Sequence, residues 1–152
     1  MLKVIVAFLL AVLAADIFGV ITYSQLNLAA LVELGMPVDF GVRMSTTWHD
    51  LLSMSQAYVL LLIVALGIAF SIAALILKRA PQIRYLGFIS AGFVALLVLN
   101  LGAIEATGGM HPLPVTRTTI GLLSQCLAGA VGGWVFASIR SRQLDKSRQL
   151  DP

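Results

Sequence analysis

The sequence predicts an all-α fold, a four-helix transmembrane bundle, from its composition and from the length of its apolar runs. The chain of 152 residues is 59% hydrophobic and 11% charged, with a mean hydropathy of +0.97. A soluble domain carries about 25% charged residues, so a soluble protein of this size is excluded. The single cysteine, Cys126, excludes a disulfide scaffold. Four continuous runs approach the roughly 20 apolar residues that cross a bilayer as a helix.

These runs define a four-span membrane domain over residues 1–140, followed by a polar tail over residues 141–152. Residues 1–14 also resemble a cleavable signal peptide, in which a short apolar run ends at small residues. The apolar character resumes up to Tyr23, which favours a full first span, and cleavage stays open. The spans are expected at residues 4–23, 57–77, 85–104 and 118–139.

Basic residues fix the expected orientation. Eight of the ten Lys and Arg residues lie at the start of the chain, between the second and third spans, or after the fourth; only Arg43 and Arg117 lie opposite. The positive-inside rule then predicts a multi-pass protein of the cytoplasmic (inner) membrane with both termini in the cytoplasm. The net charge of +3 is divided among short stretches. This division indicates lipid headgroup contacts rather than nucleic-acid binding.

A long extracytoplasmic segment, residues 24–56, connects the first two spans. Its leucines predict a short apolar helix that ends at Gly35. A second helix is expected to begin at residues 45–47, where Thr47 and Asp50 form a capping-box-like pair, and to run through Trp48 into the second span. We expect this partly helical loop to lie on the outer leaflet. It is either a lid over the helix ends or a surface for lipid, quinone or a partner.

Three polar residues, Asp16, Asn100 and Gln125, are predicted at similar depth in the outer half of the spans. An acid inside the membrane is by default a functional-site hypothesis. The depth follows from topology alone and does not tell which way each side chain faces. The cluster is therefore either interhelical hydrogen bonding or a polar pocket that opens outward. Asp16 is a protonated packing group, an ion-handling group, or a charge partner of Arg117 or Arg43.

Polar residues at the outer ends of the spans form a second candidate site for a ligand. No tight pairing of metal ligands occurs among them, so no metal site is predicted, and the sequence identifies no cofactor. No catalytic motif is found, so no catalytic residue is assigned and an enzyme is the less favoured class. The outer-face residues are His49, Asp50, Glu105, His111 and Arg117.

The fourth span repeats small residues every four positions, a pattern that allows close helix approach. This face is expected to pack within the bundle, or to serve a homo-oligomer or a partner subunit. Its members are Ser124, Ala128, Gly129, Gly132 and Gly133.

Three function classes follow. The first is a non-enzymatic accessory or scaffold subunit of a cytoplasmic-membrane complex, favoured by the apolar outer segment and the small-residue face. The second is a small carrier or channel that uses the pocket around Asp16. The third is a quinone- or lipid-binding subunit of a membrane enzyme.

Overall fold

The computed structural model describes residues 2–79, 81–108 and 114–150. The described residues form helices and their connections without strands, and four helices are long and apolar enough to cross a membrane. The predicted fold class, an all-α bundle with four spans, is therefore confirmed. The elements are α1 (Leu2–Glu33), α2 (Phe40–Ser53), α3 (Ser55–Leu77), η1 (Pro81–Ile83), α4 (Arg84–Ala106), η2 (Pro114–Arg117) and α5 (Thr119–Leu150).

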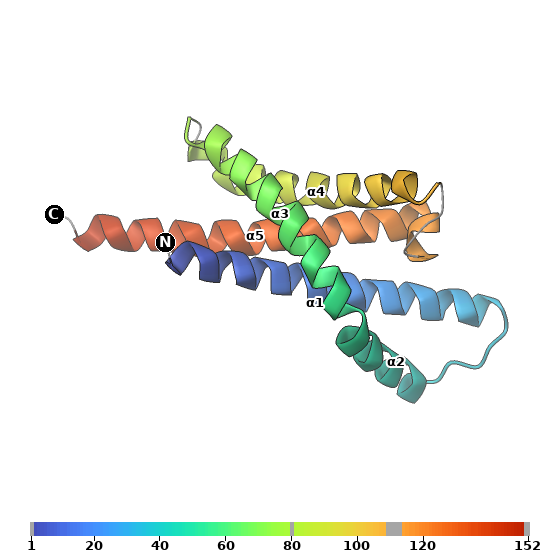
Figure 1. The fold of residues 1–152 in the computed structure, drawn as a ribbon. Coiled ribbons are helices and arrows are strands. Elements are labelled where there is room, and N and C mark those ends of the chain that lie inside the picture. The colour runs from blue at the N-terminus through green and yellow to red at the C-terminus, as the bar shows by residue number, and fades with distance from the viewer. Residues whose placement is uncertain (1, 80, 109–113, 151–152) are drawn as a thin grey trace.

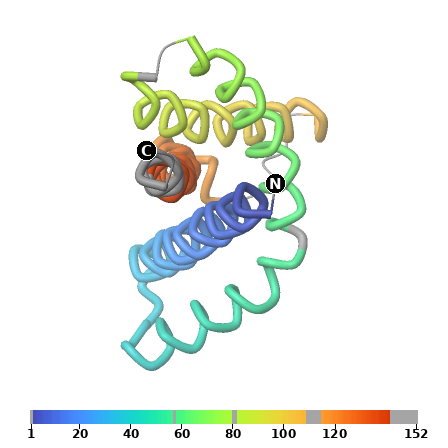
Figure 2. The backbone as a smooth tube through the Cα atoms, turned by 90° about the vertical axis from the view of Figure 1, so that its left-hand side faces the viewer, coloured from blue at the N-terminus to red at the C-terminus, as the bar shows by residue number. Residues whose placement is uncertain are grey.

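Helix α5 lies at the centre of the packing, with α1 and α4 along its two sides. Figure 1 shows these three helices running side by side, while α3 crosses them obliquely and α2 continues beyond α3 along α1. We call the end that holds the start of α1 and the α3–α4 connection the terminal end. The opposite end, which holds α2 and η2, is called the loop end. Figure 2 shows α5 between α1 and α4 when the bundle is viewed along its length.

Helix α1 is longer than the predicted span. It continues beyond Tyr23 to Glu33, and its 32 residues measure about 48 Å at 1.5 Å per residue. A hydrocarbon core is only about 30 Å thick, so part of α1 projects from it. The separate short helix predicted before Gly35 is wrong, because those residues extend α1 without a break. Ser24 and Gln25, which follow the predicted span, contact Thr47 of α2.

The end of α1 agrees with the predicted stop. Gly35 has a φ of 81°, a left-handed conformation that glycine adopts without strain. Its N–H donates to the carbonyl of Val32, and the N–H of Met36 donates to Leu31. These two bonds form a Schellman motif that satisfies carbonyls left free at the helix end.

Helix α2 begins earlier than predicted. Asp39 caps it, with the Val42 N–H donating to Asp39 Oδ1 at 2.7 Å. The expected start at residues 45–47 is wrong. Thr47 lies inside the helix and donates to the Arg43 carbonyl at 2.8 Å. The expected passage into the second span is nearly continuous, because a single residue separates α2 from α3.

The core of the terminal half is aromatic. Four phenylalanines, one from each span, contact one another around the centre of the bundle. Phe70 on α3 stacks on Phe136 of α5 with ring centroids 4.9 Å apart, and Phe88 of α4 meets Phe136 edge-on at the same distance. Phe8 of α1 contacts the edge of Phe70 at 6.3 Å. Such contacts stabilise an aromatic core by more than the burial of its surface alone. The buried polar side chains described below lie toward the loop end instead.

Candidate functional site

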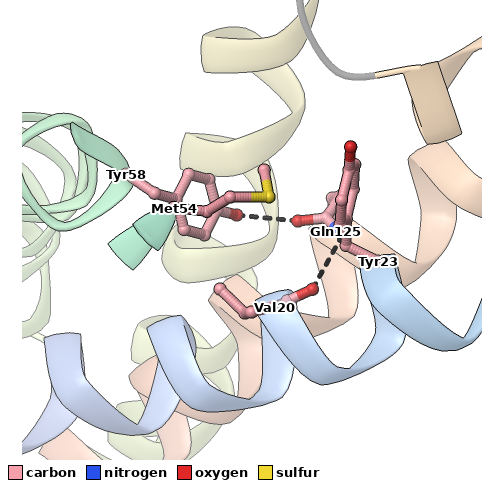
Figure 3. Close-up of a pocket in the computed structure, with 6 residues that line it drawn as sticks. Val20, Tyr23, Met54, Tyr58 and Gln125 are labelled. Carbon is pink, nitrogen blue, oxygen red and sulfur yellow. Dashed lines mark hydrogen bonds between the residues drawn. The ribbon is translucent and has the colours of Figure 1, made fainter. Parts of the chain in front are cut away.

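A polar layer in the loop half joins three spans through one side chain. Gln125 of α5 is 1% exposed. Its Oε1 accepts a hydrogen bond of 2.7 Å from the Tyr58 hydroxyl on α3. Its Nε2 donates to the carbonyl of Gly19 on α1 at 3.2 Å, as the dashed lines in Figure 3 show. Both ends of a single amide are therefore used between helices.

Gly19 is the residue that allows this close approach. A Cβ at this position would lie 3.1 Å from the Tyr58 ring and 3.3 Å from Gln125 Oε1. These separations are tighter than ordinary contacts. The absence of a side chain at Gly19 thus lets Tyr58 and Gln125 reach the α1 backbone.

Asp16 lies one helical turn before Gly19 and is 2% exposed. The Ser55 hydroxyl, at the start of α3, lies beside its carboxyl group. The geometry falls short of a hydrogen bond, and within the described chain neither Asp16 Oδ1 nor Ser55 Oγ has a partner. Buried polar atoms are stable only when they are hydrogen-bonded, so this pair is the exception in an otherwise satisfied layer.

A small cavity adjoins the polar layer between α1, α3 and α5. Its volume is about 10 Å³. A cavity must measure about 10–15 Å³ to hold one water molecule, so an organic solute has no room here. The cavity is lined by Gly19, Val20, Tyr23, Met54, Tyr58 and Gln125 (Figure 3).

Asn100 is also buried, but it bonds within its own helix. Its Nδ2 donates to the Leu96 carbonyl at 2.7 Å. Helix α4 packs on α5 and α3, whereas Asp16 and Gly19 lie on α1. Of the three residues predicted at one depth, the structure brings Gln125 of α5 to the Gly19 carbonyl of α1, one helical turn from Asp16. The Asn100 amide is satisfied separately.

The outer-face residues are spread over separate elements. His49 is exposed and Asp50 is half-buried on α2. Glu105 is exposed near the end of α4, and Arg117 is exposed at the end of η2. His111 lies outside the described residues. In the part of the chain that is described, no three His, Cys, Asp or Glu side chains gather as a metal site would require.

The small residues of α5 divide between two neighbouring helices. A Cβ on Gly129 would overlap the Gly92 carbonyl of α4, and one on Gly133 would overlap the Phe88 carbonyl. A Cβ on Gly132 would instead lie 2.9 Å from the Ala11 carbonyl of α1. Gly129 and Gly133 therefore bring α5 close to α4, and Gly132 brings it close to α1.

The other two residues of this face differ in how they are used. Ala128 is fully buried in the bundle core. Ser124 donates a 2.7 Å hydrogen bond to the Gly121 carbonyl of its own helix. The small residues of α5 thus make their described contacts inside the bundle.

No protein-family model, curated protein or solved structure matches this chain. Its function is therefore inferred from the chemistry and geometry of its own residues.

A second feature that bears on function is the attachment of α2 to α1, which is polar. Thr47 Oγ1 lies 3.1 Å from Ser24 Oγ and accepts a hydrogen bond of 2.9 Å from Gln25 Nε2. Arg43 Nη1 donates to Gln25 Oε1 at 3.1 Å. Arg43 and Thr47 thus attach α2 to α1.

A face of α2 next to these polar residues carries exposed apolar residues spaced four apart, which we call the α2 stripe. Residues at this spacing lie on one helix face. Their exposed fractions are large: Phe40 76%, Met44 59%, Trp48 63% and Leu52 59%.

Sequence reasoning overlooked two members of the polar layer, Ser55 and Tyr58. Tyr58, at the start of the second span, suits the membrane interface by its residue type, yet it is only 8% exposed. Their spacing of three residues, which puts both side chains on one face of α3, is the signal that identifies them.

Proposed function

We propose that this protein is a non-enzymatic accessory subunit of a cytoplasmic-membrane complex, and that the α2 stripe is its docking surface. The observation that carries the proposal is that α2 leaves the four apolar residues of the stripe exposed. An amphipathic helix normally turns its apolar face toward the core of its own protein. Helix α2 instead turns Arg43 and Thr47 toward α1 and leaves the stripe uncovered.

The length of α1 supports a position for the stripe at the membrane surface. About 48 Å of helix exceeds a hydrocarbon core of about 30 Å, so the section that carries Ser24 and Gln25 extends toward the headgroups. Polar bonds between α1 and α2 suit that depth. The distribution of basic residues puts this end on the extracytoplasmic side.

The chemistry of the stripe favours an apolar groove on a partner membrane subunit. Anchors at positions i, i+4 and i+8 are the pattern by which one helix face docks into a groove. Aromatic residues such as Phe40 and Trp48 dominate the energetics of such contacts.

A crosslinking experiment in the native membrane tests this function. A photoreactive amino acid at Met44 is expected to crosslink one partner subunit, and native mass spectrometry is expected to find the same subunit at fixed stoichiometry. The Met44→Ser/Trp48→Ser variant should lose it. The matched control, Leu34→Ser/Val42→Ser, changes two exposed apolar residues outside the stripe and should retain it. A wild-type chain that crosslinks lipid alone would overturn the accessory function.

A second candidate function is supported by the unpartnered carboxyl oxygen of Asp16. A carboxyl group between helices and beside a hydroxyl is suited to bind and release a proton. The small cavity favours a proton over an organic solute. In this case the protein is a small proton-coupled carrier with its pocket at Asp16 and Gln125.

Proton flux in proteoliposomes tests this second function. Asp16→Asn is expected to abolish the flux while Glu105→Gln, an exposed acid near the loop end, preserves it. Equal flux in wild type and Asp16→Asn would exclude the proton function without touching the accessory function. The residues of the enzyme-subunit hypothesis that the structure describes lie on separate elements, α2, α4 and η2, and this separation gives that function no support.

A further inference from the structure

We propose that the terminal end of the bundle binds one anionic phospholipid, with its phosphate between Arg84 and Arg140 and one acyl chain in a groove between α3 and α4. This inference is independent of the docking surface on α2, which lies at the loop end.

The first observation is a pair of like charges. Arg84 begins α4, and its guanidinium is the charged neighbour of Arg140 on α5. Both side chains are half-buried, and Arg140 Nε is buried with no hydrogen-bond partner in the described residues. A 2.6 Å hydrogen bond between Tyr85 and Ser141 holds the two helices together beside them. Two cations in such a position repel each other unless an anion lies between them.

The chain places its described acidic side chains elsewhere. Four of them lie toward the loop end and the fifth lies in the middle of α1, so none is near Arg140. Lys78 and Arg79, in the α3–α4 connection, add to the positive charge of the terminal end. The acids with described side chains are Asp16, Glu33, Asp39, Asp50 and Glu105.

The second observation is an apolar groove of about 780 Å³ between α3 and α4. Figure 1 shows these two helices diverging from their connection at the terminal end. The volume lies within the range of about 300–1,000 Å³ typical of small-molecule sites. The groove lining includes Ile68, Ile72, Ile76, Ala91 and Val94.

The groove and the arginine pair are continuous. Ile83 and Gly87, which lie on either side of Arg84 in the sequence, line the groove near the terminal end, and Leu99 lines its far end. From Ile83 to Leu99 the groove runs about 24 Å along α4, longer than one leaflet of a core about 30 Å thick. An acyl chain in the groove therefore brings its phosphate to the level of Arg84.

Charge complementarity selects the headgroup. A phosphatidylglycerol headgroup brings one negative charge to the two arginines. A phosphatidylcholine headgroup adds a trimethylammonium group, which the same basic residues repel. Burying an acyl chain contributes to either lipid equally, so the arginines determine the preference.

Native mass spectrometry of the full chain, released from nanodiscs of equal phosphatidylglycerol and phosphatidylcholine, tests the proposal. The wild type is expected to retain one phosphatidylglycerol. Each basic residue at a membrane surface contributes about fivefold in affinity, so Arg84→Gln/Arg140→Gln should lower the preference by about 25-fold. Arg84→Lys/Arg140→Lys should keep most of it, and Arg117→Gln, an exposed arginine at the loop end, should change nothing.

Filling the groove tests the acyl-chain half of the proposal. Ala69→Trp occupies the groove and is expected to release the lipid, whereas Leu75→Trp, on an exposed part of α3 outside the groove, is expected to retain it. Equal retention of the two lipids by the wild type would overturn the proposal even if the variants fail to fold. Displacement of the retained lipid by excess inorganic phosphate would also overturn it, because the site would then recognise a free anion.

Discussion

The Tyr58 hydroxyl on α3 donates a 2.7 Å hydrogen bond to Gln125 Oε1 on α5. The same Gln125 donates to Gly19 on α1, so one amide side chain connects three of the four spans. Toward the terminal end, Phe70 of α3 stacks on Phe136 of α5. Helix α3 crosses the bundle obliquely, and these contacts hold it at two levels.

Tyr58→Phe tests the polar layer. The variant leaves Gln125 Oε1 buried without its donor, and interhelical hydrogen bonds in membranes contribute about 0.6 kcal/mol on average and up to about 1.7 kcal/mol. We expect the substitution to lower the free energy of unfolding by an amount within this range, as measured by denaturant titration in mixed micelles. Tyr85→Phe is the control, because its bond to Ser141 is exposed. An equal loss in the two variants would contradict a special role for the buried layer.

Gly92→Ala tests the contact between α4 and α5. The added Cβ would overlap the Gly129 carbonyl. Overpacking of this kind typically destabilises by about 1–3 kcal/mol. Gly102→Ala, on the same helix, meets no atom within 4 Å. It should stabilise the helix by about 0.5–1 kcal/mol, because alanine is the better helix former. The measurement is the same unfolding titration in mixed micelles. If both variants have the same free energy of unfolding, α4 and α5 do not pack as described.

Asp16→Asn tests whether the buried carboxyl group contributes to stability. The carboxyl makes no ion pair that the structure shows, and an ionised acid inside the membrane costs about 2.5–3.5 kcal/mol on insertion scales. The neutral amide should therefore leave the free energy of unfolding unchanged or raise it. The measurement is the same unfolding titration, with Glu105→Gln as the exposed control. A marked loss of stability would reveal a partner for the Asp16 charge.

Thr47→Val tests the attachment of α2 to α1. The substitution keeps the side-chain shape but removes the bonds to Ser24 and Gln25. We expect hydrogen exchange in α2 to accelerate by about fivefold, corresponding to loss of about 1 kcal/mol of hydrogen bonding. Ser45→Ala is the control, because the Ser45 hydroxyl bonds only to Val42 within α2. Unchanged exchange in Thr47→Val would show that other contacts hold α2.

The spans were predictable because hydrophobic length dominates the cost of crossing a bilayer. The end of α1 was not. Ser24 and Gln25 are as polar as residues of a loop, and only the presence of Thr47 on a neighbouring helix makes them part of a longer helix. The start of α2 was missed for a similar reason, since Asp39 and Thr47 are both acceptable caps and local sequence does not choose between them.

The topology predicts polar positions along the spans, but it does not predict the direction in which each side chain faces. Gln125 of α5 bonds to Gly19 of α1, one helical turn from Asp16, whereas Asn100 bonds to Leu96 on its own helix. A span that is apolar all round gives no indication of which face meets which neighbour. The position of Tyr58 shows the same limit, because an aromatic residue at a span end suits both the interface and the interior.

The hydrogen bond between Gln125 and Gly19 joins residues separated by 106 positions in the chain. During biosynthesis, the first two spans enter the bilayer before the fourth has been made. The Tyr58 hydroxyl therefore stays in the lipid without its acceptor on Gln125 until α5 is inserted. The nascent chain is consequently most exposed to quality-control proteases in this interval. A chain that terminates before Gln125 would leave a fragment that membrane chaperones recognise by its unsatisfied polar groups.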